Sequence, residues 1–557
     1  MTVHAPLAAL AAIALVPLVS LARIEEPVGV EAIRATLVLV LPLASAAASA
    51  ILIALDRIHG TRSLRADAIS FALALAVIAR LLVAPVSRDG AGLVLVAAVA
   101  IRVAPVLLRA IGDRRTGRGL AFALSLVVYL ALAMWGVVGM AAQGDQAHYL
   151  LAAEAIRRGT TDVDVAYEEP GLYESLAQQQ IVDEDRTAHV VTARGGSRLL
   201  QGYGLPVALL PGWTIAGRAG ALATIALIAA YASAQTQRLA RDVAGDSVPT
   251  RAAWALFAFS VPFLSFATET FPNALGAALI VSVARWGLVA DAPARAGIAA
   301  GLTLFLTPRD GLTAALLAAA ALVLGRGRVP LIAGALAIAA VAALAAFAIY
   351  GVPVPYAGYF LGAAQVDRIS DEKLVALRPA VALPGMLFDR AFGLAGTAPW
   401  AFIGALGVAS LLRRAGGVAV ALLAVVFLTL GALALYGPWQ GGWSPPNRYT
   451  VELLPLWTPF VAAALAAASL WQRAVTAALI APSLVATLWL TAIPRLAYSG
   501  NESELVRWLT KYVPSAPLRW LPSFALDGLP SAELRSLVLA IGIAFLVVLG
   551  ARGRRTA

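Results

Sequence analysis

Apolar stretches close to 20 residues long recur from one end of this chain to the other, and they restrict its fold more than any other feature. About 20 residues are what a helix needs to cross the hydrocarbon of a bilayer. Inside lipid, every backbone N–H and C=O needs a partner within the protein, so such stretches form helices or a closed barrel. Barrel strands are alternating segments of about 10 residues, whereas these runs are longer and do not alternate. The pattern predicts an all-α, polytopic helical bundle in a membrane.

The composition agrees with this prediction. Hydrophobic residues make up 61% of the chain and charged residues 13%, with a mean hydropathy of +0.83, whereas soluble domains carry about 25% charged residues. The absence of cysteine excludes disulfides and cysteine-ligated metals. The net charge of +11 does not come from a basic run with interleaved aromatic residues. It therefore gives no reason to expect a nucleic-acid partner.

The hydropathy pattern predicts about 16 transmembrane helices. We expect them at 5–22, 35–55, 68–86, 91–109, 119–141, 219–239, 252–268, 273–290, 296–308, 311–324, 330–350, 397–412, 416–436, 451–470, 474–493 and 534–551.

The short loops rich in arginine are expected to face the cytoplasm. They are 56–67, 109–118, 238–251, 325–329, 413–414 and the C-terminal tail. Counting spans from either end places all of them on one side, provided that residues 203–217 do not cross. This topology predicts a multi-pass protein of the plasma (inner) membrane with both termini in the cytoplasm.

The long segments then lie outside the cytoplasm, at 142–218, 351–396, 437–450 and 494–533. Loops of this length in a compact protein are usually functional, and we expect them to carry short interfacial helices. The segment that follows the fifth span reads Asp145-Gln146-Ala147-His148-Tyr149. On a helix, Asp145, His148 and Tyr149 share a face. A partly desolvated carboxylate there suits a general base, although Asp is also a common helix N-cap.

Further polar residues fall at the same predicted surface. Each of these residues also has a purely structural explanation: a solvated acidic loop, a hydrated helix end, a snorkelling arginine or the aromatic belt. The functional alternative is binding of a sugar or a phosphate through carboxylates, arginine forks and aromatic rings. The candidates are Glu168, Glu169, Glu269, Arg309, Asp389, Arg390, Trp443, Arg448 and Tyr449.

These motifs, in this order, resemble the GT-C superfamily of membrane glycosyltransferases, in the branch of protein O-mannosyltransferases and aminoarabinose transferases. The likeness covers roughly residues 119–493 as short motifs, and the outer-loop motif D-E-x-H/R-Y/F of that family is similar to residues 145–149. Residues 1–118 would then be additional N-terminal transmembrane helices, 119–493 the catalytic region with outer loop 142–218, and 494–557 an outer loop and the last span.

The resemblance implies Asp145 as the catalytic base and His148 as a contact to phosphate or sugar. The family's second acid is replaced by Gln146, which leaves Glu168, Glu169 or Glu269 as candidates for that role. It also implies a polyprenyl-phosphate-linked sugar donor held at the lipid boundary, and an acceptor on a protein, lipid or glycan. No cofactor is required by the sequence, and a divalent metal stays open.

The sequence therefore predicts a glycosyltransferase that acts on the extracytoplasmic face. Two alternatives remain. A transporter or flippase would place charges in the middle of its spans, where Arg80, Arg102 and Arg285 are the notable ones. An O-antigen polymerase or ligase-like enzyme of cell-envelope glycan or lipid would also have a large outer loop.

Overall fold

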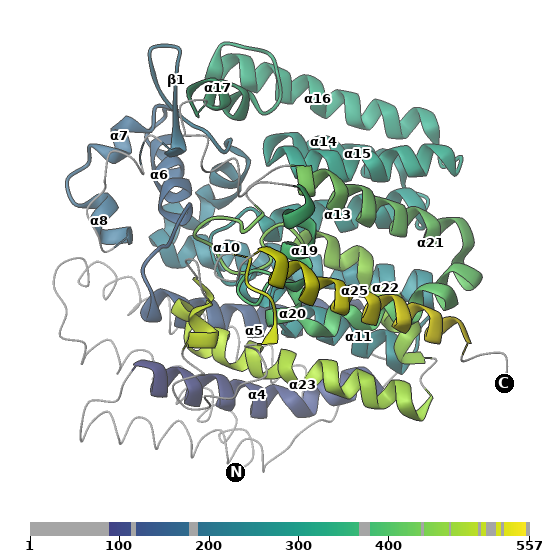
Figure 1. Ribbon diagram of the computed structural model, residues 1–557. Coiled ribbons are helices and arrows are strands. Elements are labelled where there is room, and N and C mark those ends of the chain that lie inside the picture. Colours follow the sequence, from purple (N-terminus) through teal and green to yellow (C-terminus); the bar gives the residue numbers. More distant parts are fainter. Residues whose placement is uncertain are drawn as a thin grey trace, which may run out of the picture.

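The computed structural model describes residues 88–112, 118–177, 186, 188–366, 379–435, 439–466, 469–498, 503–507, 520–524 and 529–552. In this part of the chain, nearly all regular structure is helical (Figure 1). The expected spans 5–22, 35–55 and 68–86 lie outside the described residues.

Six helices of the described residues are long and apolar enough to cross a membrane. They contain the segments Gly119–Val137, Gly204–Ala244, Arg328–Tyr350, Pro399–Leu435, Leu470–Ala492 and Ser531–Val548. The prediction of a mainly helical protein with several membrane-length apolar helices is therefore confirmed. The expected number of about 16 spans is not, because several of the expected segments form helices too short to cross alone.

Prolines mark the points at which the short helices begin. The expected span 252–268 is divided into α11 (Val248–Phe259) and α12 (Phe263–Phe266). The expected spans 296–308 and 311–324 correspond to α14 (Pro293–Leu302) and α15 (Pro308–Val323), each of which begins at a proline. A proline at the first helical position fixes the helix start because it lacks the N–H that a preceding turn would use.

Buried polar contacts join the central helices. In α5 (Arg118–Gly139), the Tyr129 hydroxyl donates to the Ala258 carbonyl oxygen at 2.8 Å, and Ser125 bonds Ser233 of α10 (Gly204–Ala244) at 2.8 Å. The Trp254 indole N–H also donates to Ser233, at 2.9 Å. Hydroxyl and indole groups in lipid must find partners within the protein, so these bonds fix how the helices pack.

Glycines bring α14 against α16 (Arg328–Tyr350). A Cβ on Gly297 would lie 2.1 Å from the Leu331 carbonyl oxygen, and one on Gly334 would lie 2.6 Å from that of Ala294. Small residues let two membrane helices approach closely. Most of the remaining surface of α16 is exposed, since only 11% of its apolar window is buried within the protein.

The segment 203–217 does not continue the span that follows it. Ala216 and Gly217 have non-helical backbone angles inside α10, and Gly217 has a φ of 53°. Beyond the bend the two parts fold together, because a Cβ on Gly220 would lie 1.9 Å from the Gly212 carbonyl oxygen. The bend therefore separates the first turns of α10 from the long helix that follows. The position of this segment relative to a membrane remains a prediction.

Five more helices belong to the bundle, and one of them also contains a break. The expected spans 397–412 and 416–436 meet at Gly416, which has non-helical angles inside α21 (Ile403–Leu435). The others are α4 (Arg88–Gly112), α22 (Leu454–Ala466), α23 (Leu470–Ala492) and α25 (Leu529–Arg552).

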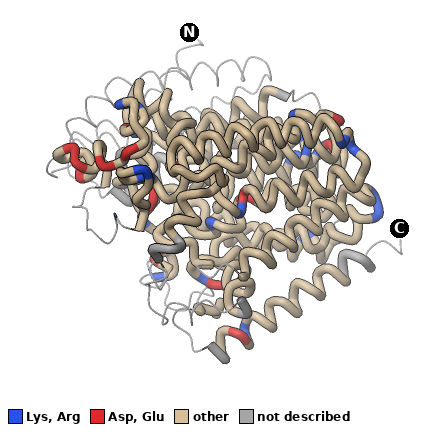
Figure 2. Tube along the Cα trace, turned by 90° about the horizontal axis from the view of Figure 1, so that it is seen from above, with Lys and Arg blue, Asp and Glu red and all other residues tan. Residues whose placement is uncertain are grey.

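Arginine-rich loops meet at one end of the bundle. The Arg251 guanidinium donates to the Ile111 carbonyl oxygen at 2.7 Å and pairs with Asp246, and Arg285 pairs with Asp242 at 3.0 Å. Several Lys or Arg segments gather at this end in Figure 2, whereas the acidic segments near α7 and α8 lie at the other end. Three of the loops that the sequence places on one side, 109–118, 238–251 and 413–414, thus lie together, because a Cβ on Gly245 would also touch Arg414.

Short elements lie in the segments between the long helices. They are α6 (Gln146–Arg157), α7 (Asp164–Tyr167), α8 (Leu172–Ala177), α17 (Ala357–Val366), α19 (Pro379–Phe388) and α20 (Leu394–Thr397). The expectation of short helices here is confirmed. A small antiparallel hairpin, β1 (Val190–Ala193) and β2 (Gly196–Leu199), departs from the all-α expectation, with Val190 opposite Leu199.

Candidate functional site

Two loops that are far apart in the sequence meet immediately before α6. Gly144 has a φ of 52°, and a Cβ on it would lie 2.0 Å from the Trp443 carbonyl oxygen. The Trp443 indole N–H donates to Gln143 at 3.0 Å. Only glycine combines this backbone conformation with so close a contact. The loop that contains Arg448 is therefore held against the start of α6.

Asp145 lies at the N-cap position of α6, but its side chain makes no capping hydrogen bond. Its Oδ1 lies 3.1 Å from His189 Nε2, and its Oδ2 accepts from Arg448 Nη2. The side chain is 17% exposed. The carboxylate is therefore held by two partners from distant segments and is still partly open to a ligand.

Arg448 determines the charge state of Asp145. Burial alone would raise the pKa of this carboxyl, but the Arg448 guanidinium and the His189 hydrogen bond outweigh it. Together they hold the pKa of Asp145 well below its usual range. The group is an ionised carboxylate at any physiological pH.

The other two residues of the predicted α6 face are buried. His148 Nδ1 lies 2.5 Å from the Tyr167 hydroxyl, and the His148 ring stacks on His189 with centroids 3.8 Å apart. Tyr149 is 2% exposed. Burial raises the pKa of Tyr149, with a smaller contribution from the nearby Asp145 charge.

Arg448 is itself fixed from three sides. Its Nη1 donates to the Gly441 carbonyl oxygen at 2.9 Å, its guanidinium lies 5.1 Å from the centre of the Phe271 ring, and its backbone carbonyl accepts from Asn273 Nδ2 at 2.6 Å. Its Nε is buried without a hydrogen-bond partner among the described residues. An arginine with one buried unused donor is a candidate to bind an anionic group.

Gln146, where the resemblance expects an acid, connects α6 to the loop before α13 (Asn273–Leu288). Its Nε2 donates to Glu269 Oε2 at 3.2 Å and to the Tyr498 hydroxyl at 2.7 Å. Its Oε1 accepts from the Thr270 hydroxyl at 2.9 Å. The Tyr498 hydroxyl also donates to Glu269. Burial raises the pKa of Glu269 to about 8, so this carboxyl holds a proton at neutral pH.

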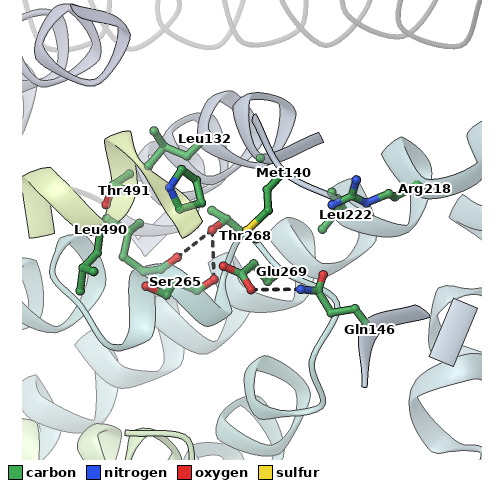
Figure 3. A pocket seen from close by; sticks show the side chains of 13 residues that line it. Leu132, Met140, Gln146, Arg218, Leu222, Ser265, Thr268, Glu269, Leu490 and Thr491 are labelled. Atoms are coloured by element: carbon green, nitrogen blue, oxygen red, sulfur yellow. Dashed lines mark hydrogen bonds between the residues drawn. The ribbon is translucent and has the colours of Figure 1, made fainter. Parts of the chain in front are cut away.

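Gln146 and Glu269 line a small pocket (Figure 3). The two side chains face each other in it, and Arg218 of α10 lines it as well. Arg218 is 9% exposed, and its Nε has no hydrogen-bond partner among the described residues. The rest of the wall includes Leu132, Leu222, Leu264 and Leu490. The pocket thus combines one buried cation with apolar side chains and with polar ones, which are Gln146, Ser265, Thr268, Glu269 and Thr491.

Arg309 forms a second buried ion pair at this end. Its Nε and Nη2 donate to both oxygens of Glu452 at 2.9 and 2.8 Å, and it lies 4.9 Å from the centre of the Tyr449 ring. The neighbouring Asp310 accepts from the Thr307 hydroxyl at 2.6 Å, and its charge also acts on Arg309 and Glu452. The Arg309 guanidinium is therefore already paired with Glu452. The sequence analysis does not single out Glu452.

Asp389, Arg390 and Trp443 are placed differently. The Asp389 carboxylate accepts from the backbone N–H groups of Ala391, Phe392 and Phe524, at 2.7, 3.0 and 2.9 Å. This is the geometry of a carboxylate that holds a loop. Arg390 is 8% exposed, whereas Trp443 is 49% exposed. The Trp443 ring packs beside Tyr498 with ring centroids 6.2 Å apart. Because half of the Trp443 side chain is exposed, it remains available to a ligand.

Glu168 and Glu169 are exposed. Glu169 pairs with Arg158 at 2.8 Å. Of the three acids considered as substitutes for the family's second acid, Glu269 is the one that contacts Gln146. In the described ranges, no group of three or more His, Cys, Asp or Glu side chains could hold a metal ion.

Sequence reasoning does not single out Arg218, Glu452 or Tyr498, and it interprets His189 only as part of a solvated acidic loop. His189 stands in an acidic loop 44 residues after Asp145, and no local spacing connects the two. Arg218 could have been recognised from the sequence, because it is a cation at the start of an apolar run and charges in membrane helices are costly. The same holds for Glu452 in the apolar helix that follows Val451.

Two comparisons with known proteins found no match. No protein-family model matches it, and no curated protein sequence is detectably similar to it.

Proposed function

We propose that this protein is a membrane glycosyltransferase that moves a sugar from a polyprenyl-phosphate-linked donor to an acceptor hydroxyl on the extracytoplasmic face. One observation carries the proposal: an ionised, partly exposed carboxylate lies one residue before Gln146, which lines a pocket that also contains leucines and a buried arginine. A lipid-linked phosphate needs both an apolar groove and a cation.

In the proposed reaction, the acceptor oxygen attacks the anomeric carbon of the sugar. The bond from that carbon to the phosphate oxygen breaks, and the acceptor's proton passes to Asp145. Negative charge develops on the departing phosphate, where preorganised cations are most effective. Arg448 is suited to this role because it contacts Asp145 and has an unused buried donor.

The Arg448 pair also explains how a carboxylate with a lowered pKa acts as a base. Before the donor phosphate binds, the Arg448 guanidinium weakens the basicity of Asp145. A phosphate that binds Arg448 would compete for its donors and so restore that basicity. Base strength would then appear only when donor is bound.

The arrangement of charges favours this proposal over transport. A transport path would need charges along the middle of the spans. Arg285 lies instead in the last turn of α13 and pairs with Asp242 at 3.0 Å. The side chains of Arg80 and Arg102 are outside the described residues. The extracytoplasmic position of the site and the cytoplasmic termini belong to the same proposal.

The test is transfer from a radiolabelled polyprenyl-phosphate sugar by purified protein in lipid nanodiscs, with wild type and Asp145→Asn compared. Loss of the base predicts a rate lower by about 10² to 10⁴-fold. Asp246→Asn is the matched control, because it makes the same change in an ion pair at the arginine-rich end. Normal transfer by Asp145→Asn at normal expression would contradict the role of Asp145.

A further inference from the structure

The two oxygens of Asp145 have different kinds of partner. Oδ2 accepts from Arg448, whose charge is permanent, whereas Oδ1 meets His189 Nε2 at 3.1 Å. An imidazole ordinarily changes its charge between about pH 5 and 8. One side of the carboxylate is therefore held by a fixed cation and the other by a group that can gain or lose a proton. The His189 side chain is 13% exposed, so solvent protons can reach it.

A second imidazole lies directly against His189. The rings of His148 and His189 are 3.8 Å apart and within 6° of parallel. His148 is 1% exposed and bonds Tyr167. Two imidazolium rings at this distance would repel each other strongly. The stack therefore fixes the orientation of the His189 ring toward Asp145 and leaves room for only one positive charge.

We propose that His189 is a positioning residue that orients the Asp145 carboxylate and, through its own protonation, sets how strong a base that carboxylate is. This inference rests on the proposed function, in which Asp145 takes the acceptor's proton. It adds a regulation of that step by pH.

The physical reason is the difference between two hydrogen bonds. Neutral His189 donates an ordinary N–H bond to Oδ1. Protonated His189 donates a charge-assisted bond, which is about twice as strong and stabilises the ionised form of Asp145. With Arg448 on the other oxygen, the carboxylate then has two cations and a lower affinity for the acceptor's proton. Transfer should fall as the pH drops through the range in which His189 gains its proton.

Other charged and titratable groups face this pair, and they must be separated from His189. Tyr167 and Tyr173 lie against His148, with ring centroids 5.9 and 6.0 Å away. Arg186 lies over Tyr167, and Arg448 is fixed as a cation. Asp145 itself titrates far below this range, but the pKa of Glu269 is about 8, which falls at its upper end.

The experiment compares transfer rates of wild type, His189→Gln and His189→Ala from about pH 5 to 8, in the nanodisc assay. Glutamine keeps an N–H donor near the position of Nε2 but does not titrate. We expect His189→Ala to lower kcat by about 10- to 100-fold, as misplacement of a catalytic group does. We expect His189→Gln to recover most of that loss and to lack the decrease at acid pH.

Two further variants assign the decrease to its source. Glu269→Gln removes the carboxyl that titrates near pH 8, and His148→Asn keeps a group near Nδ1 to bond Tyr167. Both should retain the acid decrease of wild type, whatever their absolute rates.

Two results would overturn the inference while the proposed function stands. In the first, His189→Gln keeps the wild-type acid decrease. In the second, it is as impaired as His189→Ala at every pH, which is what a purely structural role predicts. Absence of transfer in wild type would instead overturn the proposed function, and the inference with it.

Discussion

The Gln146 side-chain amide donates to the Glu269 carboxyl at 3.2 Å, and this bond joins the first turn of α6 to the loop before α13. It places a neutral amide where the resemblance to the GT-C glycosyltransferases expects an acid. Because Glu269 is buried and holds a proton near neutral pH, an amide is the partner that brings no second negative charge into the pocket.

Glu269 should make the stability of the protein depend on pH. Burial raises its pKa from 4.5 to about 8, so the folded state binds this proton more tightly than the unfolded state does. The resulting stabilisation is complete below about pH 4.5 and is lost as the pH rises through about 8. Glu269→Gln should therefore show a smaller fall in melting temperature than wild type between pH 5 and 8.5. Parallel melting curves for the two proteins would refute this.

The Arg309–Glu452 ion pair should be costly to break from one side. Both side chains are buried, at 11% and 3% exposed. Arg309→Met leaves the buried Glu452 carboxyl without its partner, which costs about 3 to 5 kcal/mol. The double variant Arg309→Met with Glu452→Met removes both charges and should be the more stable of the two. Detergent-induced unfolding measures this, and additive losses would show that the pair is not coupled.

Gly144 should not tolerate a side chain. Its φ is 52°, and a Cβ would meet the Trp443 carbonyl oxygen at 2.0 Å. We expect Gly144→Ala to displace the loop that carries Arg448, and so to reduce transfer by about 10²-fold. Gly159→Ala is the matched control, because Gly159 also has a positive φ, 81°, but nothing lies within 4 Å of its Cβ position. Equal transfer by the two variants would exclude a role for this contact.

Arg218 should act on donor binding rather than on the chemical step. If its unused Nε meets the phosphate, Arg218→Gln should raise the KM for the lipid-linked donor by about tenfold, equivalent to 1.4 kcal/mol. Arg218→Lys keeps the charge and should lose less. A change in kcat with an unaltered KM would assign Arg218 to another role.

Much of the fold follows from apolar runs and their breaks, but the number of spans does not. The run at 252–268 is apolar enough to read as one span, yet α11 ends at Phe259 and a new short helix begins at Phe263. Hydropathy averages over such a break, whereas the backbone at Ser260 and Pro262 is extended and then turned. The bend at Gly217 was easier to foresee, because proline and glycine crowd that segment.

For the candidate site as well, the sequence identifies some residues but not the contacts between them. Asp145 and Arg448 could be singled out because each stands in a short polar motif beside an apolar run. Their ion pair could not, since it spans 303 residues of sequence. Asp389 shows the opposite error, because the same kind of motif holds a carboxylate that bonds three backbone N–H groups. Sequence patterns locate polar residues at a surface, but only packing decides which of them face one another.

The β-hairpin has a mechanical consequence. The Tyr350 hydroxyl, at the end of α16, donates to the Leu199 carbonyl oxygen at 2.7 Å, and Arg198 donates to the Ile349 carbonyl oxygen at 3.2 Å. The hairpin begins directly after His189, whose carbonyl oxygen accepts from Leu200 at 2.8 Å. Since α16 is the least enclosed of the long helices together with α25, a thicker or thinner bilayer that tilts it would pull on the imidazole beside Asp145.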